Sequence, residues 1–114
     1  MNEKQNYSKH NFKEISDKVQ EQYKNFALET VNDHCLRMSV FQEVYPWHFH
    51  KNTDELFIVL EGRLTIEIED NETIILEPGE FIKIPANTIH RTSATTRTVN
   101  LCFERNADDT TFVD

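Results

Sequence analysis

Apolar and polar residues alternate along much of this chain, most clearly from Arg63 to Glu69. Apolar side chains fall there at every second position, so one face of a strand would be buried and the other solvated. The segment from Leu56 to Leu60 is apolar throughout and is expected to be buried on both faces. The period-two signal predicts strands at 26–31, 35–44, 55–60, 63–69, 73–76, 81–84 and 97–103.

A helical spacing precedes the strands, because apolar residues recur there at intervals of three and four. These residues are Phe12, Ile15, Val19, Tyr23 and Phe26. The pattern predicts a short amphipathic helix or arm, which would need a partner surface to persist because its other positions are polar. Residues 1–10 are expected to form a flexible tail, and residues 106–114 a polar, frayed C-terminal tail.

The connections between the predicted strands are short and contain residues typical of turns. Glu61-Gly62 and Asp70-Asn71 each join two strands. Glu77-Pro78-Gly79-Glu80 predicts a type II turn with Gly at its third position. Short strands with such turns indicate an all-β protein, an antiparallel sandwich or barrel. No linker or repeat interrupts residues 11–105, so we expect a single domain there.

Composition narrows the possible partners and locations. The chain has 114 residues, enough for one hydrophobic core, and a formal net charge of -8. An acidic surface repels phosphate backbones, so we expect no nucleic-acid partner. No apolar run approaches the roughly 20 residues that span a bilayer, and the polar stretch from Met1 to Asn11 does not resemble a signal peptide. We therefore expect no membrane partner and a cytoplasmic location.

The two cysteines, Cys35 and Cys102, lie far apart and do not form a C-x-x-C pair. In a reducing compartment we expect two buried free thiols rather than a disulfide.

Four residues with metal-binding side chains fall at positions that a barrel interior can bring together. His48 and His50 lie two apart, so on a strand both point to the same face. Residues 51–54 are expected to form a turn that interrupts the alternation of the strand, so that Glu55, at the start of the next strand, can face the same cavity. His90 comes from a later hairpin. Three imidazoles and one carboxylate suit one divalent transition-metal ion: iron, manganese, nickel, copper or zinc.

The other histidines are expected outside this set, His10 in the solvated tail and His34 at the surface end of a strand. Phe57 lies two residues after Glu55, so on a strand both side chains face the same side. Phe57 therefore belongs either to the core alone or also to the lining of the metal cavity. Asn100 and Cys102 alternate with apolar neighbours, and the sequence leaves open whether they face the cavity or solvent.

The predicted ligands belong to two longer patterns. His48-Phe49-His50 is followed after four residues by Glu55 and after six more by Gly62. This string resembles the first motif of the cupin family, in which the histidines and the glutamate are metal ligands. The glycine that opens the family's motif is replaced here by Gln42.

The second pattern comprises Gly79, Pro85-Ala86-Asn87 and His90, which resemble the second cupin motif in order and spacing. Asn87 stands where the family has its central glycine, and because Asn tolerates left-handed backbone the turn can survive. Ala94 stands where the family often has Asn, which leaves the surroundings of the ligands open. None of these departures removes a predicted ligand.

The resemblance covers residues 26–104 and implies the jelly-roll β-barrel, or double-stranded β-helix, of the cupins. It also implies a homodimer and a metal bound by His48, His50, Glu55 and His90. The chain is similar to small single-domain cupins, some of which are described as resembling mannose-6-phosphate isomerase.

Function is less constrained than fold, because one fold hosts many chemistries. The first hypothesis is a metal-dependent enzyme of dioxygenase or isomerase type acting on a small organic substrate, with Glu55 as a ligand rather than a base. The second is a metal- or small-molecule-binding module without catalysis, and the third a structural protein that acts through dimerisation. A further alternative is that the histidines bind no metal and only form hydrogen bonds in the core. The sequence does not indicate a residue that could act as a general acid or base.

Overall fold

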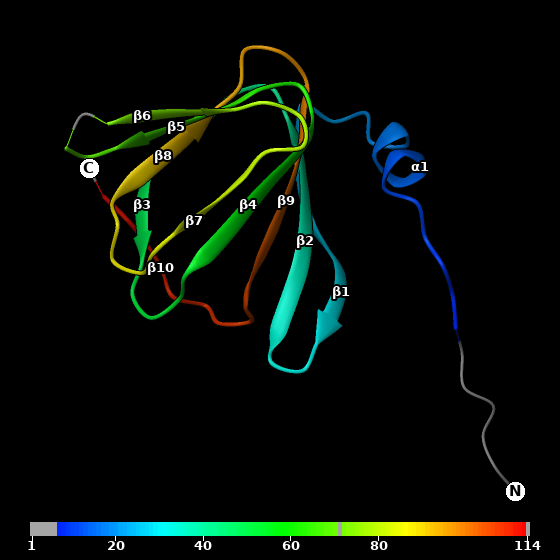
Figure 1. Ribbon diagram of the computed structural model, residues 1–114, viewed down its shortest axis with the longest axis horizontal. Helices are drawn as coiled ribbons and strands as arrows, with labels where there is room; N and C mark the ends of the chain where they lie inside the picture. Colours follow the sequence, from blue (N-terminus) through cyan, green and yellow to red (C-terminus); the bar gives the residue numbers. More distant parts are fainter. Residues whose placement is uncertain (1–6, 71, 114) are drawn as a thin grey trace, which may run out of the picture.

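The computed structural model describes residues 7–70 and 72–113, so residues 1–6 of the expected N-terminal tail lie outside the described region. Among the described residues, a short helix precedes ten strands (Figure 1). Their bounds are α1 (Phe12–Asp17), β1 (Tyr23–Val31), β2 (His34–Phe41), β3 (Val44–His50), β4 (Glu55–Glu61), β5 (Leu64–Ile68), β6 (Thr73–Leu76), β7 (Phe81–Ile84), β8 (His90–Ser93), β9 (Thr98–Arg105) and β10 (Thr110–Phe112).

The strands form two five-stranded antiparallel sheets with a core between them. Sheet A has the order β1-β2-β9-β4-β7, and sheet B has the order β10-β3-β8-β5-β6. Most neighbours within a sheet are distant in sequence, because the chain crosses repeatedly from one sheet to the other. This is the arrangement of a jelly roll, and the predicted all-β jelly-roll barrel is confirmed.

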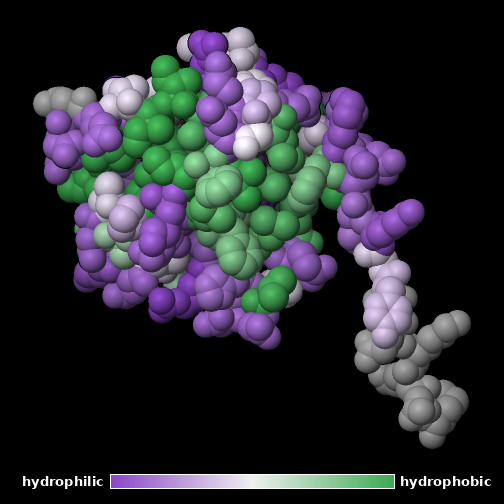
Figure 2. Space-filling model, viewed as in Figure 1, coloured by the Kyte–Doolittle hydropathy of each residue, from purple (hydrophilic) through white to green (hydrophobic). Residues whose placement is uncertain are grey.

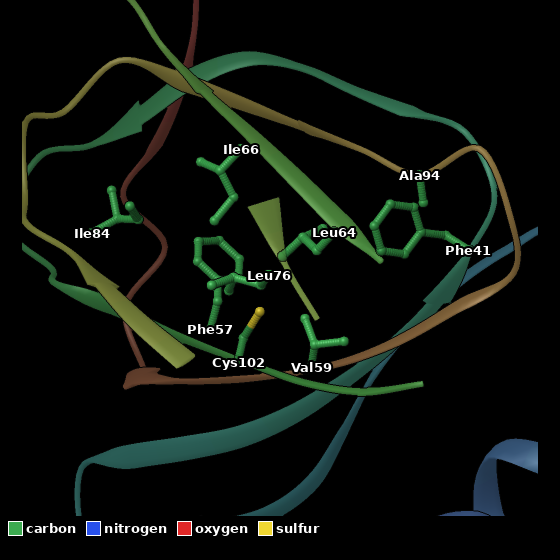
Figure 3. Packing of buried hydrophobic residues seen from close by; sticks show 9 residues of the cluster. All are labelled: Phe41, Phe57, Val59, Leu64, Ile66, Leu76, Ile84, Ala94 and Cys102. Atoms are coloured by element: carbon green, nitrogen blue, oxygen red, sulfur yellow. The ribbon is translucent and has the colours of Figure 1, made fainter. Parts of the chain in front are cut away.

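Inward-facing side chains of both sheets build the main core (Figure 3). Val59 on β4 is completely buried, and so are Leu64 and Ile66 on β5, as the alternation from Arg63 to Glu69 predicts. The cluster consists of Phe41, Phe57, Val59, Leu64, Ile66, Leu76, Ile84, Ala94 and Cys102. It occupies the region of the interior that the polar side chains described below leave free.

The outer face of sheet A carries a second apolar cluster. Met38 on β2 and Leu101 on β9 are buried there, and Ile15 of α1 packs against them. Ile58 and Leu60 are only partly buried, so β4 is fully buried on its inner face alone, which corrects the expectation of burial on both faces. Figure 2 shows hydrophobic residues gathered in the middle of the face that points towards the viewer.

The N-terminal helix is shorter than expected. It begins after Asn11, whose side chain accepts a hydrogen bond of 3.0 Å from Glu14 N, and it ends at Asp17. The helical spacing of apolar residues beyond that point was misleading, because Tyr23 already belongs to β1 and is in register with Phe41 on β2. Pairing with a neighbouring strand satisfies the backbone there in place of a helix.

Strands β6 and β7 have the predicted bounds, whereas β3, β8 and β10 were not among the strands that alternation predicted. β10 lies within the tail that was expected to be frayed, so that expectation is wrong for residues 110–112. These residues pair with β3, where Thr110 is in register with His50, because the edge of sheet B offers unpaired backbone groups. The limits of the domain at 11–105 stay a prediction.

Three turn positions have the left-handed backbone that the sequence indicated. Gly62 has φ 82°, Gly79 φ 90° and Asn87 φ 65°, so Asn87 replaces the family's glycine without loss of the turn. Glu80 N donates to Glu77 O at 3.0 Å, which closes the predicted type II turn around Gly79.

Cys35 and Cys102 are both buried and free, as predicted. Among the described residues, no helix has the length and apolar character needed to cross a bilayer.

On the outer face of sheet B, Arg91 lies over the ring of Trp47, with 4.9 Å between the guanidinium carbon and the ring centroid. Arg91 Nε also donates to Glu67 Oε1 at 2.8 Å. The carbonyl of Trp47 accepts a hydrogen bond of 2.9 Å from Val113 N, just after β10. Trp47 therefore marks the place where β3, β8 and the C-terminal segment meet.

We predict that Gly62→Ala destabilises the fold far more than Gly79→Ala. A Cβ on Gly62 would lie 2.5 Å from Arg97 O and in contact with Thr98 Oγ1, whereas a Cβ on Gly79 would meet nothing within 4 Å. Gly79→Ala should cost only about 1–2 kcal/mol for its left-handed backbone, and Gly62→Ala a further 1–3 kcal/mol, roughly, for overpacking. Urea unfolding measures both, and equal losses would contradict the prediction.

Candidate metal centre

Three strands bring the four predicted ligands to one place inside the barrel. His48 and His50 lie on β3, His90 opens β8, and the Cα atoms of His48 and His90 are in register. Glu55 opens β4 on the opposite sheet, after residues 51–54 have restarted the register as expected. One ligand atom from each of these residues lies within 4.8 Å of the others.

The size of the cluster suits a single ion. The ring centroids of His48 and His90 are 4.3 Å apart, and those of His48 and His50 are 5.1 Å apart. Metal–ligand bonds of ~2.0–2.2 Å place atoms on opposite sides of one ion roughly 4–4.4 Å apart. The side chains therefore need only small rotations to share one cation.

The cluster is buried and its inward-pointing atoms lack partners. His48, Glu55 and His90 are 4%, 7% and 1% exposed. Within the described residues, His50 Nε2, His90 Nε2 and Glu55 Oε1 have no hydrogen-bond partner. Glu55 Oε1 lies 3.2 Å from His50 Nε2 and 3.7 Å from His90 Nε2, but neither contact has hydrogen-bond geometry. Each unsatisfied buried atom costs about 1–3 kcal/mol, and a cation at the centre would satisfy all three.

Backbone carbonyls orient two of the imidazoles. His48 Nδ1 lies 2.8 Å from Pro46 O, and His90 Nδ1 lies 2.8 Å from Thr88 O. A carbonyl oxygen only accepts, so each Nδ1 carries a proton, and in the neutral ring each Nε2 presents a lone pair to the centre of the cluster. This is the tautomer that metal-binding histidines adopt when the other nitrogen is hydrogen-bonded.

The third imidazole is oriented by the C-terminal segment. His50 Nδ1 lies 3.2 Å from Thr110 Oγ1 and 3.5 Å from Asp109 Oδ1. The other oxygen of Asp109 accepts hydrogen bonds from Asn52 N at 2.8 Å and Thr53 Oγ1 at 2.7 Å. Sequence reasoning missed this contribution, because Asp109 and Thr110 lie in a polar stretch without periodicity.

Burial and mutual charge set the protonation of the cluster. Burial lowers the pKa of His48 to about 4, which keeps its imidazole neutral and able to bind a metal. Burial acts to raise the pKa of Glu55, but the close imidazoles of His50 and His90 outweigh it and lower the pKa to about 2. Burial opposes charge on His50 too, yet the neighbouring carboxylates, chiefly Glu55, raise its pKa.

A cavity of about 260 Å³ adjoins the cluster. It is lined by Tyr23, Asn25, Arg37, Ser39, Phe41, Tyr45, His48, His50, Glu55, Phe57, Thr92, Asn100, Cys102, Glu104 and Thr110. Phe57 thus belongs to both the core and the cavity wall, and its ring lies edge-on to His90 at 6.2 Å. Asn100 and Cys102, whose facing the sequence left open, point into the cavity.

Glu104 is the acidic lining residue outside the predicted ligand set. Its Cα is in register with that of Glu55, and its Oε2 is buried without a partner among the described residues. Burial, together with the charge of Glu55, raises the pKa of Glu104 to about 7. The predicted strand ended one residue earlier, so the sequence pattern gave no reason to place this side chain inside.

The remaining histidines lie elsewhere, as expected. His34 is partly exposed, its Nδ1 lies 2.8 Å from Asp33 Oδ1, and its ring stacks on Phe103 at 5.2 Å. His10 is exposed in the segment before α1.

Fold and site together define a class: a small jelly-roll domain with a buried cluster of three histidines and one glutamate that is compatible with a metal ion. The family model described as "Cupin domain" matches residues 39–103, and the chain belongs to the cupin family.

The chain is also similar to individual proteins. It is 46% identical over 100 residues to the uncharacterized protein YdbB of Bacillus subtilis strain 168, covering 88% of each chain. The crystal structure of a cupin-2 domain-containing protein from Shewanella frigidimarina NCIMB 400 superposes with a TM-score of 0.79 and 28% identity, covering 84% of this chain and 93% of that one.

A shorter match links the chain to an enzyme. Over 43 residues it is 44% identical to quercetin 2,3-dioxygenase of Bacillus subtilis strain 168. The match covers 38% of this chain and only 12% of the length of that protein.

We predict that Asp109→Asn weakens zinc(II) binding by about 10–100-fold, the usual effect of removing a partner of a ligating histidine. The substitution removes the charge that faces His50 Nδ1 and leaves the four predicted ligands intact. Competition with a chromogenic chelator measures the affinity. The neighbouring Asp108→Asn, at an exposed position, is the matched control and should bind like wild type. Equal affinities for the two variants would contradict a role for Asp109.

Proposed function

We propose that this cupin binds one divalent transition-metal ion through His48, His50, Glu55 and His90 and acts as a metal-dependent enzyme on a small organic substrate. One observation carries the proposal: unpartnered nitrogen and oxygen atoms of buried residues converge beside a cavity of about 260 Å³. Pockets for drug-sized ligands measure roughly 300–1,000 Å³, so a small molecule fits this one.

A bound ion with four protein ligands would offer one or two open positions, where it supplies Lewis acidity or a site for O₂. The protein's own contribution is to keep water out and to hold the imidazoles in one orientation. Phe57 and Phe41 supply an apolar wall, and both are 4% exposed. Carbonyl hydrogen bonds hold the rings of His48 and His90, so both imidazoles are already oriented towards the centre of the cluster when a ligand enters.

Of the two reaction types considered, we favour the oxygen-using one. The partial similarity to quercetin 2,3-dioxygenase supports it, because that protein's name describes a dioxygenase. The isomerase type remains the alternative within the enzyme class. A binding module without catalysis would use the same four residues, so only turnover separates it from the enzyme.

Metal content tests the site directly. Protein purified without added metal should contain close to one equivalent of a transition metal per chain, and His48→Ala and His90→Ala should each lose most of it. His10→Ala is the matched control, because His10 lies in the exposed segment before α1 and should keep the full content. Unchanged metal in the His48→Ala and His90→Ala variants would show that the ion is bound elsewhere.

Oxygen uptake tests the activity. Wild-type protein loaded with iron(II) or nickel(II) should consume O₂ with at least one compound from a panel of phenols and small organic acids, and the His90→Ala variant should not. Stoichiometric metal without uptake across the panel would contradict the dioxygenase proposal and favour the binding module.

We propose in addition that the chain forms a homodimer in the cytoplasm. The partly buried apolar residues on the outer face of sheet A support a second copy as the partner. They are Phe26, Leu28, Leu36, Ile58 and Leu60. Light scattering should give twice the chain mass for wild type and the monomer mass for Ile58→Lys, and a monomeric wild type would contradict the proposal.

A further inference from the structure

One positively charged side chain, that of Arg37, lines the cavity away from the predicted metal ligands. Arg37 points inward from β2, and among the described residues it is the one arginine or lysine in the cavity wall. The side chain of Arg37 is partly buried, and a guanidinium without an ion pair can bind an anion through charge-assisted hydrogen bonds. Arg37 is therefore the group in this wall that is best suited to hold an anionic ligand.

The guanidinium of Arg37 is held in place but not neutralised. Arg37 Nε donates to Asn25 Oδ1 at 2.7 Å, and Asn25 Nδ2 in turn donates to Ser39 Oγ at 2.6 Å. Arg63 and Arg91 each pair with a glutamate at 3.0 Å or less, whereas Arg37 forms no ion pair within residues 7–70 and 72–113. Because Nε already donates to Asn25, the two terminal nitrogens of the guanidinium remain available as donors. Together they form a fork that can donate two parallel hydrogen bonds to the two oxygens of one carboxylate.

Strand register fixes how far this fork lies from the metal cluster. Cys102 on β9 is in register with Arg37 on one side and with Phe57 on the other. Neighbouring strands are ~4.8 Å apart, so the Cα of Arg37 is roughly 10 Å from that of Phe57. Glu55, a predicted metal ligand, lies two residues before Phe57 on the same face. A compact molecule can therefore reach both the fork and the cluster.

Aromatic side chains flank the space between them. Tyr23 and Tyr45 lie nearly parallel at 16° with ring centroids 6.1 Å apart, and Phe41 meets Tyr23 edge-on at 6.1 Å. Tyr45 also lies edge-on to His48 at 4.9 Å, so this wall runs up to the cluster. Such surfaces favour a flat, unsaturated or aromatic body.

We propose that the cavity binds a small organic carboxylate with a planar, unsaturated body, its carboxylate on the terminal nitrogens of Arg37 and its body against Tyr23 and Tyr45. The inference deepens the proposed function by naming the substrate class. The contact with Arg37 does not itself require a metal, so the two proposals can fail separately.

The charges of the wall favour a carboxylate over a phosphate. Glu55 and Glu104 also line the cavity, so a dianion would face two carboxyl groups with only one arginine to offset it. A monoanion matches the single guanidinium. Phosphate is accordingly an outcome of the test and not the expected ligand.

The experiment compares carboxylates with uncharged amides of the same shape. Benzoate and cinnamate are titrated into metal-free wild-type protein by calorimetry or NMR, alongside benzamide and cinnamamide. A hydrogen-bonded charge contributes about 1.5–3 kcal/mol, so at least one acid should bind about 10–100-fold more tightly than its amide. Arg37→Met should abolish this preference. If Arg37→Met fails to fold, Arg37→Lys replaces it in the test; it preserves the charge and should keep part of the preference.

The matched control is Arg105→Met, which makes the same change in net charge at an exposed position outside the cavity wall. It should leave the preference for acids unchanged. Three results would overturn the proposal: no saturable binding of either acid to wild type, equal loss in Arg37→Met and Arg105→Met, or tighter binding of inorganic phosphate than of both acids. Zinc(II) titration of the Arg37 variants should give wild-type stoichiometry, so loss of the metal site would be recognised as a separate failure.

Discussion

The architecture is constrained by the need to bury polar side chains between two sheets without leaving them unsatisfied. Three imidazoles and a carboxylate occupy part of the interior, and among the described residues the inward atoms of His50, Glu55 and His90 lack hydrogen-bond partners. The fold accommodates them by segregation: the aliphatic core of Val59, Leu64 and Ile66 fills one region of the barrel, and the polar cluster faces the cavity. The carbonyls of Pro46 and Thr88 then take up the outer nitrogen of two of the imidazoles.

The sequence predicted the strands that have one dry and one wet face, because alternation reports just that condition. β6 and β7 were placed at their observed bounds, and β5 within one residue at each end. The sequence-based prediction failed where pairing between strands determines the structure and the local pattern of apolar residues does not. Tyr23 continues a helical spacing but belongs to a strand, since its backbone is satisfied by β2. β10 has no apolar periodicity, because it is an exposed edge strand held by backbone bonds to β3.

The same division applies to the site. The residues that converge in the cluster were found from paired motifs, since each motif residue has a chemical reason to be present. The groups around them were not. Asp109 and Thr110 reach His50 through an edge strand far along the chain, and Glu104 enters the cavity because β9 continues the alternation further than predicted. Arg37 alternates with the apolar Leu36 and Met38 on β2, and its register with Cys102 on β9 places it on the inner face. Whether such a side chain faces the cavity depends on which face of its strand is covered by the other sheet. Sequence periodicity does not determine which face that is.

The position of Trp47 gives the molecule an internal optical reporter. It is the single tryptophan of the chain, it directly precedes His48, and its carbonyl receives the backbone of the C-terminal segment. Its indole is covered by Arg91, one residue after His90. The fluorescence of one side chain is thus coupled to both histidine-bearing strands and to the closing edge strand, so its emission can follow the local order of this corner of the barrel without any added label.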